Sequence, residues 1–104
     1  MLNYTLITGS SSGIGLEMAK VCATKGMNVL MVSLPKEGLE QKAEKIALSH
    51  QVTTKFFECD LTVIEDIDRL KKWVIKNKYS VNFLVNNAGF GGTIKFSEMS
   101  AELV

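Results

Sequence analysis

The chain has 104 residues, of which 46% are hydrophobic and 22% are charged, and its 12 basic and 11 acidic side chains give a formal net charge of +1. This length supports a single modest core and excludes two domains, so we expect one domain over residues 1–104. The near-neutral balance, without basic clusters, argues against nucleic acid or a membrane surface as a partner. No apolar run is long enough to span a membrane, and the first residues lack signal-peptide features. We therefore expect a cytoplasmic location.

Cysteine and histidine are too few for a disulfide scaffold or a zinc site. Cys22 and Cys59 lack CxxC spacing, and His50 is the single histidine. We expect both cysteines to pack as small apolar groups.

Apolar clusters rich in β-branched and aromatic residues recur at intervals of roughly 25 to 30 residues, which is typical of βαβ units. They predict strands at 4–7, 29–32, 56–57 and 83–85.

Three stretches between these strands have helical periodicity. The first spans 14–25 and places four apolar residues on one face, namely Ile14, Met18, Val21 and Cys22. Gly26 then favours its end. The second should begin at Pro35, whose fixed φ suits a first turn, and run to about Ser49.

The third helix has its own start signal. Thr62 followed by Glu65 matches a capping box. Five apolar residues then form a stripe, namely Ile64, Ile67, Leu70, Val74 and Ile75.

Four strands alternating with three helices predict an α/β fold with a Rossmann-like, doubly wound parallel sheet, cut off after the fourth strand. The expected strand order is 3-2-1-4, with a binding crevice where the order reverses, next to the first and fourth strands.

The most specific pattern is a glycine-rich turn, residues 8–15, between the first strand and the first helix. Gly9 can turn the chain tightly, Gly13 leaves space for a pyrophosphate, and Gly15 allows the helix to pack closely on the strand. Free N–H groups at the helix start favour a phosphate. No Gly-Lys-Ser/Thr follows, which excludes a P-loop, and the remaining alternative is a merely flexible turn.

Two further motifs end strands at the same edge of the sheet. Asp60 follows the third strand and could accept a hydrogen bond from an adenine amino group, although a carboxylate at a helix start is the alternative. The run 86–89, Asn-Asn-Ala-Gly, follows the fourth strand and could also be a simple turn.

Together, these motifs resemble the conventional branch of the short-chain dehydrogenase/reductase family: TGxxxGxG at 8–15, an aspartate motif at Asp60 and Leu61, and NNAG at 86–89. The resemblance implies a Rossmann fold and NAD(P)-dependent chemistry at a carbonyl or alcohol of a small-molecule substrate. It also implies that Asn86 ties the fourth strand to the sheet and that Thr8 braces the glycine turn. The implied cofactor-binding residues are Ser11, Ser12 and Ile14 at the pyrophosphate, Asp60 and Leu61 at the adenine, and Asn87, Ala88 and Gly89 beside the adenine-side ribose.

Cofactor choice should be set just after the second strand. A carboxylate there would hold the ribose 2′-OH of NAD, whereas a basic residue would accommodate the 2′-phosphate of NADP. The family's deciding position is occupied by Leu34, which does neither. Ser33 and Lys36 could bind a phosphate, and the stretch after the second strand has no carboxylate before Glu37 that would repel one. We therefore expect NADP in preference to NAD.

The catalytic residues of the family have no counterpart here. Its Tyr and Lys stand in a YxxxK spacing, but Tyr4 is followed four residues later by Thr8, and Tyr79 by Phe83. We therefore expect an oxidoreductase whose amino-terminal, cofactor-binding half is this chain, with no catalytic residue and no turnover of its own. The alternative is a non-catalytic dinucleotide-binding or regulatory module.

The fourth strand should lie at an open edge. Its apolar residues Val81, Phe83 and Val85 predict self-association through that edge or the apolar surface around it.

Overall fold

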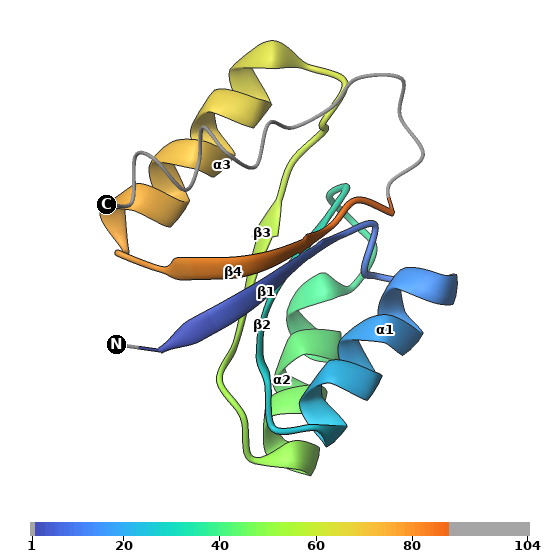
Figure 1. Cartoon of the computed structure of the whole chain (residues 1–104). Helices are drawn as coiled ribbons and strands as arrows, with labels where there is room; N and C mark the ends of the chain where they lie inside the picture. Colours follow the sequence, from blue (N-terminus) through green and yellow to red (C-terminus); the bar gives the residue numbers. More distant parts are fainter. Residues whose placement is uncertain (1, 88–104) are drawn as a thin grey trace.

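The computed structural model describes residues 2–87, which form a parallel four-stranded sheet with helices on both faces (Figure 1). Neighbouring strands pair in the order β3-β2-β1-β4, which confirms the expected α/β architecture. In chain order the elements are β1 (Asn3–Thr8), α1 (Gly13–Thr24), β2 (Asn28–Ser33), α2 (Leu39–His50), β3 (Thr54–Glu58), α3 (Ile64–Lys76) and β4 (Ser80–Val85).

The sheet separates two apolar clusters. Helices α1 and α2 cover one face and α3 covers the other (Figure 1). Strand β1 shows why both form: Tyr4 and Leu6 pack into the α3 cluster, whereas Ile7 packs into the α1–α2 cluster, because successive strand residues point to opposite faces. Within residues 2–87 no helix combines the length and apolar character needed to cross a membrane.

The face of α1 that its periodicity predicts is only partly buried: Met18 and Cys22 pack against the α1–α2 cluster, but the most deeply buried residues are others. The buried residues of α1 are Gly15, Ala19 and Ala23. Ile14 and Val21, expected to face the core, are 71% and 52% exposed. Small side chains allow a helix to approach its neighbours closely, so packing against the sheet selects the Gly/Ala stripe over the bulkier one.

Helix α2 begins later than expected, at Leu39 rather than Pro35. The intervening turn contains two residues with left-handed backbone angles, Lys36 (φ +68°) and Gly38 (φ +69°), and Gly38 is the N-cap residue. A positive φ cannot continue a right-handed helix, so the chain folds back on itself before α2 starts.

Helix α3 begins at Ile64, with Val63 as its N-cap residue and no side-chain cap hydrogen bond. The expected capping box at Thr62 is therefore wrong. The Thr62 hydroxyl instead donates to Asp60 Oδ1 at 2.6 Å, which places Thr62 in a turn ahead of the helix.

Strand β4 is displaced by a bulge. Its register with β1 shifts between Tyr4↔Val81 and Thr5↔Phe83, so Asn82 has no partner residue. An extra residue in one strand changes which side chains share a face. Val81 and Leu84 consequently pack in the α3 cluster, whereas Val85 packs in the α1–α2 cluster.

Candidate functional site

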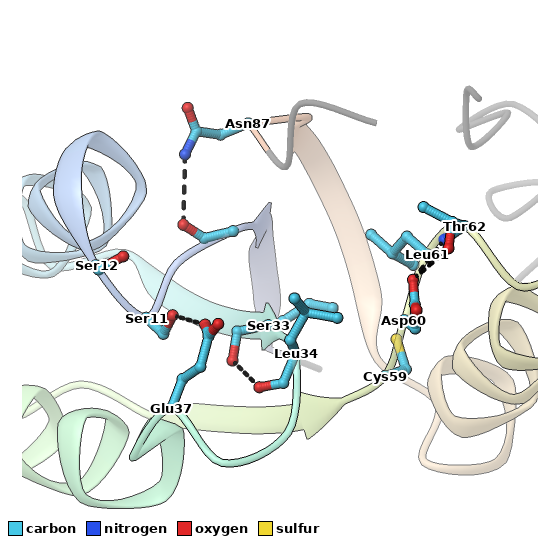
Figure 2. Close-up of a pocket in the computed structure, with 12 residues that line it drawn as sticks. Ser11, Ser12, Ser33, Leu34, Glu37, Cys59, Asp60, Leu61, Thr62 and Asn87 are labelled. Atoms are coloured by element: carbon cyan, nitrogen blue, oxygen red, sulfur yellow. Dashed lines mark hydrogen bonds between the residues drawn. The ribbon is translucent and has the colours of Figure 1, made fainter. Parts of the chain in front are cut away.

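A cavity of about 340 Å³ opens at the carboxyl ends of the strands, where parallel α/β sheets bind ligands. Figure 2 shows residues that follow β1, β2, β3 and β4 converging on this space. The lining residues are Gly9, Ser11, Ser12, Val32, Ser33, Leu34, Glu37, Cys59, Asp60, Leu61, Thr62 and Asn87.

The three glycines of the first turn have distinct geometric roles. Gly9 (φ +63°) and Gly13 (φ +56°) adopt left-handed conformations that L side chains rarely take, and a Cβ at Gly13 would enter open space. A Cβ at Gly15 would lie 2.1 Å from the carbonyl oxygen of Gly9 and 2.7 Å from Nδ2 of Asn87. Only glycine therefore permits the close approach of α1 to the turn, as expected.

Two serines of the turn bind protein groups. The Ser10 hydroxyl is fully buried, accepts from the Val32 N–H at 3.0 Å and lies 3.3 Å from the Val32 carbonyl oxygen, so it fastens the turn to β2. The Ser11 hydroxyl donates to the carboxylate of Glu37. Ser12, the N-cap residue of α1, makes no side-chain cap hydrogen bond and is exposed at the cavity.

The ends of β1 and β4 are linked through a buried threonine. The Thr8 hydroxyl donates to Asn86 Oδ1 at 3.1 Å and accepts from the Asn87 N–H at 2.9 Å. The side-chain amide of Asn87 lies 3.4 Å from the Gly9 carbonyl oxygen and donates to it. These contacts tie β4 to the sheet and hold Asn87 at the cavity, as expected for Asn86 and Thr8.

Asp60 lines the cavity, and its carboxylate is also bound within the turn that precedes α3. Its Oδ1 accepts from the Thr62 N–H at 2.9 Å as well as from the Thr62 hydroxyl, and these bonds hold the pKa of the carboxyl below its usual range. Its own N–H donates to Asp66 Oδ2 at 2.8 Å. The carboxylate thus braces the turn before α3 while it lines the cavity.

Cys59 also lines the cavity, with a thiol that is mostly buried. Burial, followed by the charge of Asp66, raises the pKa of its thiol to about 11. The thiolate is the reactive form, so we expect this thiol to react slowly near neutral pH.

Glu37 brings a carboxylate to the wall formed by the glycine turn and the end of β2 (Figure 2). Lys42, on the first turns of α2, donates to the backbone carbonyl oxygens of Ser11 and Glu37, the latter at 3.0 Å. This lysine joins the β2–α2 turn to the glycine turn and so keeps Glu37 beside Ser11.

The structure brings together only part of the expected cofactor-binding set. Ile14 and Gly13 line a separate apolar hollow on α1, Gly15 is buried behind the turn, and Lys36 is exposed and does not line the cavity. The cavity includes seven expected residues: Gly9, Ser11, Ser12, Ser33, Asp60, Leu61 and Asn87. Ala88 and Gly89 lie outside the described residues.

Leu34, the position expected to decide cofactor choice, lines the cavity, and sequence reasoning missed four further lining residues, namely Val32, Glu37, Cys59 and Thr62. The end-of-strand positions of Val32 and Cys59 carry a signal that could have found them, because strand ends border this edge of the sheet. Glu37 carries none, since only the fold of the following turn returns it to the cavity. In the part of the chain that the structure describes, no three His, Cys, Asp or Glu side chains gather as metal ligands.

Comparison with known proteins gives a consistent result. The family whose sequence model matches residues 3–104 is described as short chain dehydrogenase. A fatty acyl-CoA reductase from Acinetobacter baylyi is 45% identical over 85 residues, which cover 81% of this chain and 28% of that protein.

Solved structures show the same fold. The crystal structure of L-sorbose reductase from Gluconobacter frateurii, complexed with NADPH and L-sorbose, matches with a TM-score of 0.79 and 30% identity over 93% of this chain and 37% of that one. A short-chain dehydrogenase from Sphingobium yanoikuyae in complex with NADPH matches with a TM-score of 0.75 and 30% identity over 97% of this chain and 39% of that one. This chain therefore spans less than half the length of these proteins.

Proposed function

Since the chain belongs to the short-chain dehydrogenase family, we propose that it is the dinucleotide-binding half of an NAD(P)-dependent oxidoreductase acting on a carbonyl or alcohol. The observation that carries this proposal is the glycine turn at the carboxyl edge of the sheet. Gly13 leaves open space at the start of α1, and Gly15 makes the close approach that places this helix start beside the cavity. We include all of residues 1–104 in this half.

The residues present fit a dinucleotide. Backbone N–H groups at the start of α1, together with its positive dipole end, suit a pyrophosphate, and the exposed Ser12 hydroxyl adds a donor. Asp60 and Leu61 would hold the adenine, and Asn87, with Ala88 and Gly89, would flank the ribose. When bound, the cofactor supplies hydride transfer, and the residues of this chain hold and orient it.

We propose NADP(H) as the cofactor, with NAD(H) as the alternative. Two solved relatives are complexes with NADPH, which supports this choice. Ser33 lines the cavity, and its hydroxyl now donates to the Leu34 carbonyl oxygen at 3.0 Å, so it can turn to a phosphate oxygen instead. Lys36 lies in the exposed turn that follows.

The proton chemistry of the proposed reaction requires residues outside the described part of the chain. Tyr4 packs edge-on against Tyr79 with ring centroids 4.9 Å apart, and burial raises the pKa of both phenols. Neither lines the cavity. We therefore propose that this chain binds a dinucleotide and does not by itself turn over an alcohol or a carbonyl.

Titration of the folded chain with NADPH and, separately, with NADH, measured by isothermal titration calorimetry, tests the proposal. We expect saturable binding, and we expect the Ser12→Ala and Asn87→Ala variants to bind more weakly, because each loses a polar group at the cavity. Absence of binding to either dinucleotide, with the native far-UV circular dichroism spectrum retained, would contradict the proposed function. Oxidation of an alcohol by the purified chain would contradict its proposed inactivity.

A non-catalytic dinucleotide-binding or regulatory module is the second candidate. The sequence of the complete gene separates the two. A serine followed about a dozen residues later by YxxxK would support the enzyme, whereas its absence from the complete protein would support the module.

We further propose that copies of the chain associate through β4. Among the described residues this strand pairs only with β1, and Phe83 is 60% exposed. Unpaired strand edges with apolar side chains favour pairing with another chain. Light scattering should give a mass that rises with concentration, and a strictly monomeric mass at micromolar concentration would contradict this proposal. A reducing cytoplasm, which suits the free thiols of Cys22 and Cys59, remains the proposed location.

A further inference from the structure

A hollow of about 270 Å³ lies between α1 and α2 and shares no lining residue with the cavity at the strand ends. Leu16 and Ile46 supply its apolar part, and Lys20, Lys42 and Lys45 supply its charge. Among the described residues no carboxylate lines it, although the whole chain carries a net charge of only +1. We call this hollow the lysine groove. The fold brings together lysines that are dispersed along the sequence, so the charge of the groove needs an explanation.

The three lysines are not equally available to a partner. Lys42 Nζ donates to two backbone carbonyl oxygens, and Lys20 forms an exposed ion pair with Glu17 at 3.3 Å. Lys45 is exposed on α2 and makes no hydrogen bond or ion pair with the rest of residues 2–87. Lysine stems cover apolar surface while their ammonium groups stay in water. The groove therefore presents an apolar floor with a positive rim, of which Lys45 is the uncommitted charge.

The size of the groove favours a protein side chain over a small organic ligand. Sites for such ligands typically measure roughly 300 to 1,000 Å³ and enclose most of the ligand. The lysine groove is smaller and is bordered by exposed residues. A shallow apolar floor with cations around it complements an apolar side chain that has a carboxylate beside it.

A surface of that chemistry lies at the start of α3, on the opposite face of the sheet (Figure 1). Ile64 is 79% exposed, Val63 is 38% exposed, and the exposed carboxylate of Glu65 follows them. The next two carboxylates of α3 pair with an arginine and a lysine of the same helix, whereas Glu65 has no such pair within the described residues. We call Val63, Ile64 and Glu65 the α3 tip. It is an unpartnered apolar surface with one uncommitted negative charge.

We propose that the α3 tip of one chain docks in the lysine groove of a second copy, with Ile64 over the apolar floor and Glu65 beside Lys45. The two surfaces lie on opposite faces of the sheet, so one chain cannot close this contact on itself (Figure 1). The contact therefore joins copies head to tail. An interface of this size is weak and transient. It needs no bound dinucleotide and no strand edge, so it is separate from the proposed function and from association through β4.

Charge reversal on each side tests this proposal by sedimentation equilibrium at low salt. We expect the unmodified chain to associate at about 0.2 mM. Lys45→Glu and Glu65→Lys should each weaken the association about tenfold, because an attraction becomes a repulsion. An equimolar mixture of these two variants should regain it, and so should the double variant, since opposite charges meet again. Raising the salt to about 0.5 M should weaken the association of the unmodified chain.

Lys55→Glu is the matched control, because it makes the same charge change at an exposed residue of β3 outside the groove and the α3 tip. Its association should stay within about twofold of the unmodified chain. Pairing through β4 is common to all these variants and cannot produce a gain on mixing. A mixture that associates no more than its two folded components would overturn the proposal. Equal weakening by Lys55→Glu, or an unmodified chain that stays monomeric, would overturn it as well.

Discussion

Helices α1 and α3 lie on opposite faces of the same sheet and reach it in different ways. Helix α3 buries Leu70 and Val74, which belong to the apolar stripe visible in its sequence. Helix α1 buries Gly15, Ala19 and Ala23 most deeply and leaves Ile14 and Val21 exposed. Its other large apolar residues are partly buried against the α1–α2 cluster, namely Leu16, Met18 and Cys22. Helix α3 thus packs on the sheet through large apolar side chains, whereas α1 packs through small residues that let its backbone approach closely. A hydrophobic pattern in the sequence does not indicate the second kind of packing.

The largest loss of stability should come from adding a Cβ at Gly15 of α1, where the helix lies close to the glycine turn. The Gly15→Ala variant places a Cβ 2.1 Å from the Gly9 carbonyl oxygen. Backbone atoms must then move, and we expect a loss of more than about 4 kcal/mol, seen as loss of the cooperative unfolding transition in urea.

Gly13→Ala is the control for this variant, because its Cβ would meet open space and only the positive φ is strained. We expect a cost of about 1 to 2 kcal/mol. Equal destabilisation by the two variants would contradict the close-approach role of Gly15.

The next largest loss of stability concerns α3, which packs on the sheet through large apolar side chains. Leu70 is fully buried in the α3 cluster, so Leu70→Ala should destabilise the chain by about 3 kcal/mol through lost burial and the cavity left behind. Ile64, expected in the same apolar stripe, is instead 79% exposed, so Ile64→Ala should cost less than about 0.5 kcal/mol. Urea denaturation of both variants measures the difference, and similar costs would contradict the burial of Leu70 against the sheet.

The pH dependence of stability reports on the α3 cluster through Cys59. Burial raises the pKa of Cys59 to about 11, so the folded chain holds this proton more tightly than the unfolded chain does. The resulting stability is complete below about pH 9 and is lost as pH rises toward 11. Tyr4 and Tyr79, with raised pKa values, act in the same direction. Cys59→Ala should therefore make the alkaline loss of stability, measured by urea denaturation from pH 8 to 11, shallower without abolishing it.

Thiol labelling at pH 8 sharpens this comparison. Cys22 lies on α1 and is half-buried, whereas Cys59 is 3% exposed. Burial raises the pKa of the Cys22 thiol as well, so both should react slowly, but Cys22 should react about tenfold faster than Cys59. Faster reaction of Cys59 would contradict its placement in the α3 cluster.

The smallest effect is expected at the exposed apolar side of α1. Val21 is 52% exposed, and valine and serine have similar helix propensities. Val21→Ser should change the free energy of unfolding by less than about 0.5 kcal/mol, as urea denaturation would show. A larger loss would mean that α1 packs on the face that its periodicity predicts.

Much of this architecture follows from local sequence signals. The apolar clusters predict the four strands, and the glycine turn predicts the sharp entry into α1, because Gly9, Gly13 and Gly15 each meet a constraint that other residues cannot. Asn87 and Asp60 were placed at the cavity by the rule that parallel strands end at one edge.

Only the tertiary structure decided which face of α1 is buried, where the turn after β2 leads and what carboxylate borders the cavity. Close packing on the sheet favours Ala19 and Ala23 over larger neighbours, a preference that depends on the distance between elements rather than on their sequence. Glu37 lies 26 residues from Ser11 and still accepts a hydrogen bond from that hydroxyl, because two left-handed residues reverse the chain between β2 and α2. The sequence by itself determined a dinucleotide-type fold with its phosphate turn, and the folded chain determined the charge that surrounds it.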